Sequence, residues 1–313
     1  MKTIIGIPLL VVIVVSIGVF FLKKVTKPVA TTEIDLALMK EVSGPLVLDR
    51  GYEGPGNIEN VKRLLQQGAN PHIVTTHGST LLMRANSDNL EMIKTLLAAG
   101  VDVNSKDHFG NTALMLHRKN PKAVALLLKA GARVNSRDAE GQDALMRASK
   151  DGLVETVRLL LDNKADVHAK DNQGLTALMF ASRLSTNPIL PTRRFLVSTE
   201  GHEKTVQLLL AAGADVHATD KEGQTSLFHA VQWGNEMTLV GSIVGTQFQS
   251  QEQVQVVKLL LDKGIEINHK DKSSKTALSH ASWVAQILRE EQKELRQMEI
   301  ELILSLKSAG AKE

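Results

Sequence analysis

The chain contains no cysteine and few aromatic residues. Its 313 residues include no Cys, and Phe, Trp and Tyr together make up 3% of them. The absence of thiols excludes disulfide bonds, thiolate metal sites and cysteine nucleophiles. Large aromatic side chains normally fill much of a compact core. Their scarcity therefore favours thin helical layers packed by Leu, Ala, Val and Met.

A strong excess of charge of one sign is also lacking. The chain has 37 Lys and Arg residues against 34 Asp and Glu residues, which leaves a formal net charge of +3. This small excess does not indicate nucleic acid or an acidic partner. The sequence also lacks a Walker phosphate loop, a GxSxG elbow and an HExxH helix. We therefore expect no catalytic residues, no cofactor and no metal ligands, although an enzyme with an unrecognised site stays a minor alternative.

One long apolar run stands at the start of the chain. Residues 3–22 read TIIGIPLLVVIVVSIGVFFL and carry no charge. A helix of this length spans about 30 Å, the thickness of a bilayer core. A cleaved signal peptide has a shorter apolar region and a small-residue cleavage motif, and no such motif closes this run. We predict that residues 1–27 form a membrane anchor or uncleaved signal sequence, with a cleaved signal peptide as the alternative.

The charges that flank this run give a weak indication of orientation. Lys2 precedes it, and Lys23, Lys24 and Lys27 follow it. The positive-inside rule slightly favours a cytosolic domain after the anchor, and an extracytoplasmic one stays open. The expected location is a bacterial-type inner membrane or a plasma membrane, crossed once.

A hexapeptide recurs through the rest of the chain. Residues 110–115 read GNTALM and residues 174–179 read GLTALM, with looser copies starting at Gly78, Gly141, Gly223 and Ser274. The steps between equivalent positions are 32, 31, 33, 49 and 51 residues. Leucine-rich runs that end in a small turn, such as the one before Gly213, keep the same phase. Each unit therefore contains two helices. A threonine such as Thr176 can cap the first helix. Apolar residues at helical spacing mark the second, as Val206, Leu209 and Leu210 do before Gly213 ends it, and as Val157, Leu160 and Leu161 do one unit earlier. Stacked units bury each other's apolar faces.

The repeated pattern Gly-x-Thr-Ala-Leu-x-x-Ala, followed by x-x-Val-x-x-Leu-Leu-x-x-Gly-Ala-Asp-Val, resembles the ankyrin repeat. The resemblance covers about residues 36–311. It implies an all-α solenoid of about seven stacked helix-turn-helix repeats with short β-hairpin fingers, preceded by the single transmembrane helix. We expect this repeat domain to span residues 28–313, with its first and last repeats as caps.

The chain departs from the family pattern at the position where ankyrin repeats favour histidine. Met83, Met115, Met146 and Met179 stand there in four repeats. Since methionine packs but is a poor hydrogen-bond partner, we expect a softer solenoid. His117 replaces an alanine and is expected to be buried and hydrogen bonded. His168 and His217 share a position with asparagines of other repeats, which indicates a structural turn.

Three later repeats are longer than the others, and their extra residues fall between the two helices of a repeat. The insertions lie at about 185–200, 235–253 and 284–300. Long segments in a protein of short loops are often functional, and drift on a tolerant surface is the alternative.

Ankyrin partners contact the finger tips and the end of the first helix of each repeat, so the resemblance implies candidate protein-binding residues. Trp233 and Trp283 fall at this place in adjacent repeats, as an exposed aromatic pair typical of a hot spot or as residues buried by the insertions. The other candidates are Phe109, Leu175, Arg183, Leu184, Lys221 and Lys272.

The function expected from the sequence is noncatalytic protein binding by a membrane-tethered adaptor or scaffold, whose partner is a protein rather than nucleic acid or a small molecule. The alternative is an inhibitor or immunity-like protector that binds one enzyme at a membrane. The fold alone does not name the partner.

Overall fold

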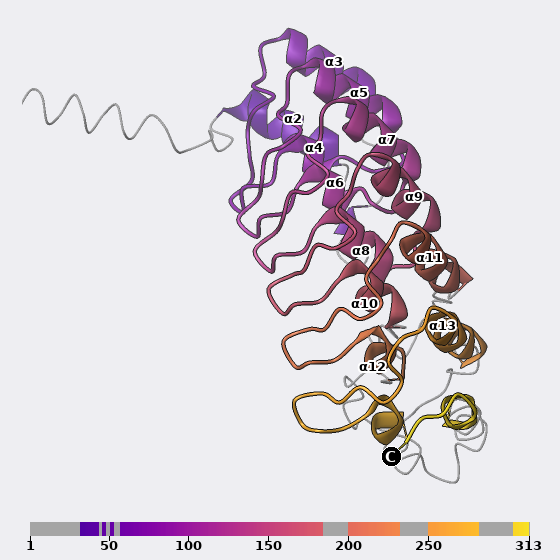
Figure 1. Ribbon diagram of the computed structural model, residues 1–313. Helices are drawn as coiled ribbons and strands as arrows, with labels where there is room; N and C mark the ends of the chain where they lie inside the picture. The colour runs from indigo at the N-terminus through magenta and orange to yellow at the C-terminus, as the bar shows by residue number, and fades with distance from the viewer. Residues whose placement is uncertain are drawn as a thin grey trace, which may run out of the picture. The chain divides into compact units, whose positions relative to one another are not determined.

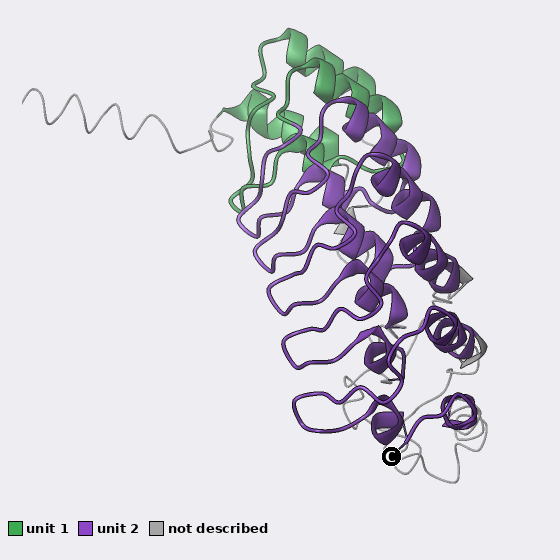
Figure 2. Cartoon of the chain, in the orientation of Figure 1, with its two compact units in different colours: residues 1–102 green, residues 103–313 purple. Residues whose placement is uncertain are grey.

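The computed structural model describes residues 32–43, 46–47, 51–52, 57–183, 200–231, 250–281 and 303–312. It divides into two compact units, residues 1–102 and 103–313 (Figures 1 and 2). The apolar residues 3–22 lie outside the described residues, as does the end of the predicted anchor. Among the helices that are described, none combines the length and apolar character needed to cross a bilayer.

Within its described residues, the first unit contains four helices and one short hairpin. Its helices are α2 (Glu33–Ser43), α3 (Ile58–Gln66), α4 (Leu81–Arg84) and α5 (Leu90–Ala98). Helix α2 packs against α3 and α4, and α5 packs against α3 and α4. Strand β1 (Leu46–Val47) pairs with β2 (Gly51–Tyr52) in an antiparallel register that places Leu46 opposite Tyr52.

The second unit repeats a short inner helix followed by a longer outer helix. The inner helices are α6 (Ala113–Leu116), α8 (Ala144–Lys150), α10 (Ala177–Ser182) and α12 (Ser226–Val231). The outer helices are α7 (Pro121–Lys129), α9 (Val154–Asp162), α11 (Glu200–Ala211) and α13 (Ser250–Asp262). Helical segments over 277–281 and 303–308 follow in the same order. Within the described residues of both units, seven inner and seven outer segments match the predicted number of repeats.

Inner helices stack on inner helices, and outer helices on outer helices (Figure 1). Helix α10 contacts both α8 and α12, while α11 contacts both α9 and α13. Of the residues predicted to face the core, Val157, Leu160, Val206 and Leu209 are fully buried, whereas Leu161 and Leu210 are half-buried. The helical spacing of apolar residues therefore identified the packed face of each outer helix.

The repeated threonine starts the inner helices, as the sequence predicted. The Thr112 hydroxyl accepts a hydrogen bond from the amide of Met115, and Thr176 does the same with Met179. Asp143 takes this position in α8 and accepts from Met146. Each side chain satisfies an amide that the first turn of a helix leaves without a backbone acceptor.

The ends of the outer helices also follow the prediction. Gly213 has φ 89° after α11, and Lys164 has φ 64° at the same position after α9. A side chain in this left-handed region costs about 1 kcal/mol relative to glycine. The turn after α9 is therefore the strained member of the set.

The expectation that methionine only packs at the family's histidine position is wrong in two repeats. The amide of Thr80 donates to the sulfur of Met83 at 3.5 Å, and Thr176 donates to Met179 at the same distance. Both sulfurs complete a reciprocal cap with the threonine hydroxyl. The prediction for His117 is confirmed, because it is 1% exposed and has a hydrogen-bonding or electrostatic partner.

The first two long insertions do not interrupt the stack. Residues 184–199, 232–249 and 282–302 lie outside the described residues. Helix α10 nevertheless packs against α11, and α12 against α13. These contacts match those of α8 with α9, a pair that has no insertion between its helices.

Candidate protein-interaction surface

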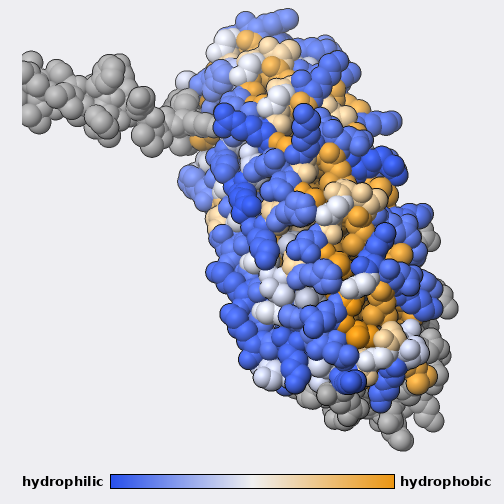
Figure 3. Space-filling view, in the orientation of Figure 1, coloured by the Kyte–Doolittle hydropathy of each residue, from blue (hydrophilic) through white to orange (hydrophobic). Residues whose placement is uncertain are grey.

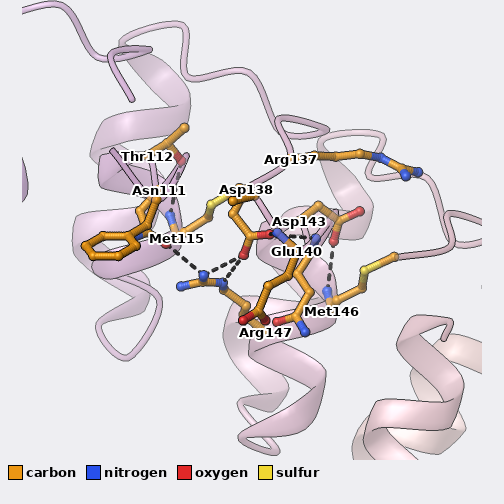
Figure 4. Close-up of polar contacts among 12 residues, drawn as sticks. Asn111, Thr112, Met115, Arg137, Asp138, Glu140, Asp143, Met146 and Arg147 are labelled. Atoms are coloured by element: carbon orange, nitrogen blue, oxygen red, sulfur yellow. Dashed lines mark hydrogen bonds and ion pairs between the residues drawn. The ribbon is translucent and has the colours of Figure 1, made fainter. Parts of the chain in front are cut away.

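In the second unit, a hairpin finger precedes each inner helix, and the first of them leads into α6. An aspartate starts the turn of every finger and binds its backbone. The Asp138 Oδ1 atom accepts hydrogen bonds from the amides of Glu140 at 2.8 Å and Gln142 at 2.9 Å (Figure 4). Its equivalents, which accept the same pair of amides, are Asp107, Asp171, Asp220 and Asp271. These bonds fix the conformation of each finger tip.

Backbone hydrogen bonds join the finger tips to one another. The amide of Ala139 donates to the carbonyl of Phe109 at 2.9 Å, and the amide of Asn172 donates to Glu140 at 2.9 Å. The next two fingers are joined in the same way: the backbone amide of Lys221 donates to the carbonyl of Gln173 at 2.9 Å, and the backbone amide of Lys272 donates to the carbonyl of Glu222 at 3.0 Å. We call these four bonds the finger ladder. It sets the register of five fingers, so equivalent tip residues lie side by side.

The close approach of the fingers requires glycine at the turn. Gly141 has φ 80°, and a Cβ atom placed on it would lie 2.8 Å from the amide nitrogen of Asn172. A side chain there would clash with the backbone of the next finger. The last finger carries Ser274 at this position with φ 61°, and no further finger follows it within the described residues.

The second carboxylate oxygen of three finger aspartates binds a cationic or titratable side chain from the following inner helix. Arg147 Nε donates to Asp138 Oδ2 at 3.1 Å, and its Nη2 donates to Asn111 Oδ1 of the preceding finger at 2.7 Å (Figure 4). His229 Nε2 lies 2.9 Å from Asp220 Oδ2, and His280 Nε2 lies 3.0 Å from Asp271 Oδ2. These contacts tie each finger to its inner helix.

The two Asp–His pairs alter the acidity of their carboxyl groups. Burial raises the pKa of Asp220 and Asp271, but hydrogen bonds from the paired histidine and from backbone amides outweigh burial. The net result is a pKa below the ordinary value for both groups. The side chains of Asp220 and His229 are each only 7% exposed, so this pair braces the fold and is closed to a substrate in solution.

Asp143 shows the opposite shift. Burial raises its pKa above the ordinary value and exceeds the lowering by the Met146 amide and by the positive charge of Arg137. The negative charge of Asp166 adds to the increase. This residue therefore caps α8 at an electrostatic cost that the threonines of the other inner helices do not carry.

A row of cations links neighbouring fingers from the side. Lys106 Nζ donates to the backbone carbonyl of Arg137 at 2.6 Å, and Arg137 Nη1 donates to the backbone carbonyl of Lys170 at 2.6 Å. Lys170 Nζ in turn donates to the backbone carbonyl of Thr219 at 2.7 Å. Each charge is thus held at a fixed place on the side of its finger.

The asparagine position noted in the sequence bridges neighbouring repeats. Asn104 donates to the carbonyl of Gly131 at 3.0 Å and accepts from the amide of Arg133 at 2.7 Å. Asn135 and Asn268 make the same pair of contacts to the units that follow them. The prediction of a structural turn position is therefore confirmed for the three asparagines. In the described part of the chain, no cluster of three or more His, Asp or Glu residues is arranged to hold a metal ion.

Three of the predicted binding residues lie on the finger tips. Phe109 is 60% exposed, although its backbone is fixed by Asp107 and Ala139. Lys221 and Lys272 are exposed at equivalent positions of adjacent fingers. Figure 3 shows that the finger edge of this unit is covered mainly by hydrophilic residues.

The remaining candidates lie elsewhere or outside the described residues. Leu175 is half-buried, and its amide donates to Asp171 Oδ1 at 2.8 Å where the finger closes. Arg183 is half-buried and caps the end of α10, with its amide donating to Met179. Leu184, Trp233 and Trp283 lie outside the described residues. The structure thus brings Phe109, Lys221 and Lys272 into one row of tips.

The sequence interpretation missed the finger aspartates. The signal was present, since in the second unit an aspartate stands three residues before each finger glycine and before Ser274. Both carboxylate oxygens are used in the fold, which explains why the residue recurs with the glycine. Recognising this pairing would also have revealed Arg147, His229 and His280 as the partners nine residues later.

Comparison with known proteins supports the repeat assignment. A model described as ankyrin repeats in three copies matches residues 52–138 and 116–191, and a second, described as ankyrin repeats in many copies, matches residues 195–240. No match was found among curated proteins. The crystal structure of an ankyrin repeat domain from Acinetobacter baumannii AYE is similar, with 29% sequence identity and a TM-score of 0.53. The alignment covers 74% of this chain and 98% of that one.

The same assignment follows from the repeat length, the paired helices, the joined fingers and the family models. The chain belongs to the ankyrin repeat family, whose repeats form protein–protein interaction modules.

Proposed function

We propose that the chain is a noncatalytic adaptor or scaffold that binds a protein partner along the finger tips of residues 103–313. The observation that carries the proposal is the finger ladder, which holds five tips in register by backbone bonds. The backbone of such a row is already ordered, so a partner loses less conformational entropy when it binds there.

Phe109 is the first anchor on this row. Its side chain is 60% exposed. Its backbone is held on both sides, because its amide donates to Asp107 Oδ1 and its carbonyl accepts the ladder bond from Ala139. A large exposed aromatic on a rigid support is typical of an interface hot spot. At the same tip position the following fingers carry Glu140, Gln173, Glu222 and Ser273, so the aromatic contact is confined to one end of the row.

Site-specific photocrosslinking tests this proposal in cells. A photoreactive phenylalanine analogue at position 109 is compared with the same analogue at the exposed position 129 at the end of α7. We expect a discrete protein adduct from position 109 and none from position 129. Equal adducts from both positions, or none from either, would remove the finger row as the binding surface.

We further propose that residues 3–22 tether this module to a membrane, on the basis of their length and lack of charge. A tether would raise the concentration of the module next to membrane-bound partners. Alkaline carbonate extraction and protease accessibility of intact, outer-barrier-opened and lysed cells test the tether and its orientation. Release of the full-length chain by carbonate would exclude a transmembrane anchor.

A further inference from the structure

The sequence of the last two fingers mixes four lysines with three acidic residues, but the fold separates the charges. Residues 220–224 read DKEGQ and residues 270–275 read KDKSSK. Along the sequence, acidic residues alternate with lysines in both segments. In the structure the aspartates turn inward and the lysines turn outward.

The two aspartates are fully used inside the fold. The Asp220 side chain is 7% exposed and the Asp271 side chain 3%. One oxygen of each accepts two finger amides, and the other binds a histidine of the next inner helix. Their charge is therefore withdrawn from the finger surface.

The lysines, in contrast, are exposed and have no described partner. Lys221, Lys270, Lys272 and Lys275 are all exposed, and no ion pair or side-chain hydrogen bond involves their ammonium groups within the described part of the chain. Lys221 and Lys272 occupy the same tip position of adjacent fingers, which the ladder bond from Lys272 to Glu222 holds together. We name these four lysines the basic finger patch.

The acidic residues near the patch do not cancel it. Glu222 is the one exposed acid on these two tips. Asp215 and Glu266 are exposed too, but each stands at the opposite end of its finger, directly after an outer helix. Glu266 is in addition 3.5 Å from His269 Nδ1.

The other fingers of this unit differ. Their tips read DHFGN, DAEGQ and DNQGL over residues 107–111, 138–142 and 171–175. None of these tips carries a lysine or arginine, and the cations beside them donate to backbone carbonyls of the next finger. The finger row therefore changes from aromatic and neutral at Phe109 to basic at Lys272.

We infer that the basic finger patch binds an acidic segment of the protein partner. This inference rests on the proposed function and adds the chemistry of the partner: an apolar group for Phe109 and a run of Asp or Glu residues for the last two fingers. Complementary charge steers association and fixes the direction in which the partner lies on the row.

An acidic protein segment fits the patch better than nucleic acid or a lipid surface. Single-stranded nucleic acid is bound by cations interleaved with aromatic platforms, and these two tips carry no aromatic residue. Glu222 lies within the patch and would repel a continuous row of phosphates. A carboxylate segment can instead place its charges on the lysines and leave Glu222 to solvent.

The test is a titration of the purified full-length chain in non-ionic detergent with a fluorescein-labelled oligoglutamate peptide. The variant carries Lys221→Gln, Lys270→Gln, Lys272→Gln and Lys275→Gln. The control makes the same change of charge at exposed lysines of the outer helices, with Lys122→Gln, Lys129→Gln, Lys204→Gln and Lys258→Gln. Circular dichroism checks that both variants keep the helix content of the parent.

We expect the patch variant to lose about tenfold in affinity for oligoglutamate at low ionic strength and the control to change by less than about twofold. Raising the salt concentration should weaken the parent, because the four charges are exposed. Three results would overturn the inference: no binding by the parent, equal losses in both variants, or a larger patch-dependent affinity for an oligothymidylate or for phosphatidylserine vesicles than for oligoglutamate.

Crosslinking separates failure of this inference from failure of the proposed function. The four patch substitutions are introduced into the chain that carries the photoreactive residue at position 109. A reduced partner adduct supports the acidic segment. An undiminished adduct overturns it while the proposed function stands, whereas no adduct from the unsubstituted parent removes the proposed function itself.

Discussion

Arg147 and His229 occupy the same position of their repeats and bind the same oxygen of the aspartate that starts their finger. Arg147 Nε lies 3.1 Å from Asp138 Oδ2, and His229 Nε2 lies 2.9 Å from Asp220 Oδ2. Arginine is charged at every pH at which proteins fold, whereas histidine is titratable. One finger is therefore braced by a guanidinium group and the later fingers by imidazole groups.

The Asp–His braces should make the last repeats sensitive to low pH. Folding lowers the pKa of Asp220 and Asp271 below the ordinary value of 3.8. A carboxyl group whose pKa is lowered by folding stabilises the native state above its unfolded pKa, and that contribution is lost as the pH falls through the folded value. We expect the free energy of unfolding to decrease as the pH drops below 3.8.

Replacing His229 by leucine tests the brace directly. The change leaves a buried Asp220 oxygen without its partner, which should cost about 1–3 kcal/mol at neutral pH. It should also shift acid unfolding to higher pH. Urea denaturation at several pH values measures both effects. His168→Leu, at an exposed histidine, is the control, and equal losses in the two variants would contradict the brace.

Replacing Asp143 by threonine should stabilise the chain at neutral pH. Burial raises the pKa of this carboxyl. A carboxyl group whose pKa is raised by folding favours the native state below its unfolded pKa. That contribution to the free energy of unfolding is lost as the pH rises through the folded value. Threonine fills the same cap in α4, α6 and α10 and keeps the bond to the third amide. Thermal melts at neutral pH should show a higher midpoint, with the gain disappearing below pH 3.8; a lower midpoint at neutral pH would contradict the account.

Two glycines with the same backbone geometry should respond differently to alanine. Gly131 has φ 87° with nothing within 4 Å of an added Cβ, whereas the Cβ of Gly141 would lie 2.8 Å from the Asn172 amide nitrogen. We expect Gly131→Ala to cost about 1 kcal/mol from left-handed strain. Gly141→Ala should cost about 3 kcal/mol, since the clash forces the fingers apart. Urea denaturation measures the difference, and similar losses would show that the finger ladder is not rigid.

Leu209→Ala should destabilise the stack by about 2–5 kcal/mol, because this side chain is fully buried in α11. The preceding Leu208 is only half-buried, so Leu208→Ala should cost clearly less. Chemical denaturation of the two variants compares neighbouring leucines of one helix. A reversed order would mean that the helix is rotated relative to the structure described here.

The parts of the fold that were predicted from sequence depend on local chemistry. Apolar spacing identified the buried face of α11, Thr176 identified the start of α10, and Gly213 identified the end of an outer helix. Each of these signals is contained within a few residues of the chain, so one sequence is sufficient to read it.

The basic finger patch could not be read in this way. Lys272 and Asp271 are adjacent in sequence, and the contacts of Asp271 with two finger amides and with His280 of the next inner helix direct one charge inward and leave the other exposed. Similarly, the reach of Arg147 to Asn111 joins two fingers and depends on the stacking of repeats. The predicted anchor and the two tryptophans stay predictions, since they lie outside the described residues.

The finger ladder has a consequence for how this chain can change in length. Lys221 donates to Gln173 in the same manner as Asn172 donates to Glu140, although residues 184–199 are inserted between the first pair. The spacing of the tips is thus insensitive to what is added between an inner and an outer helix. Evolution, or an engineer, can lengthen or exchange those segments while the partner-facing row keeps its register, so the two parts of the protein are free to diversify independently.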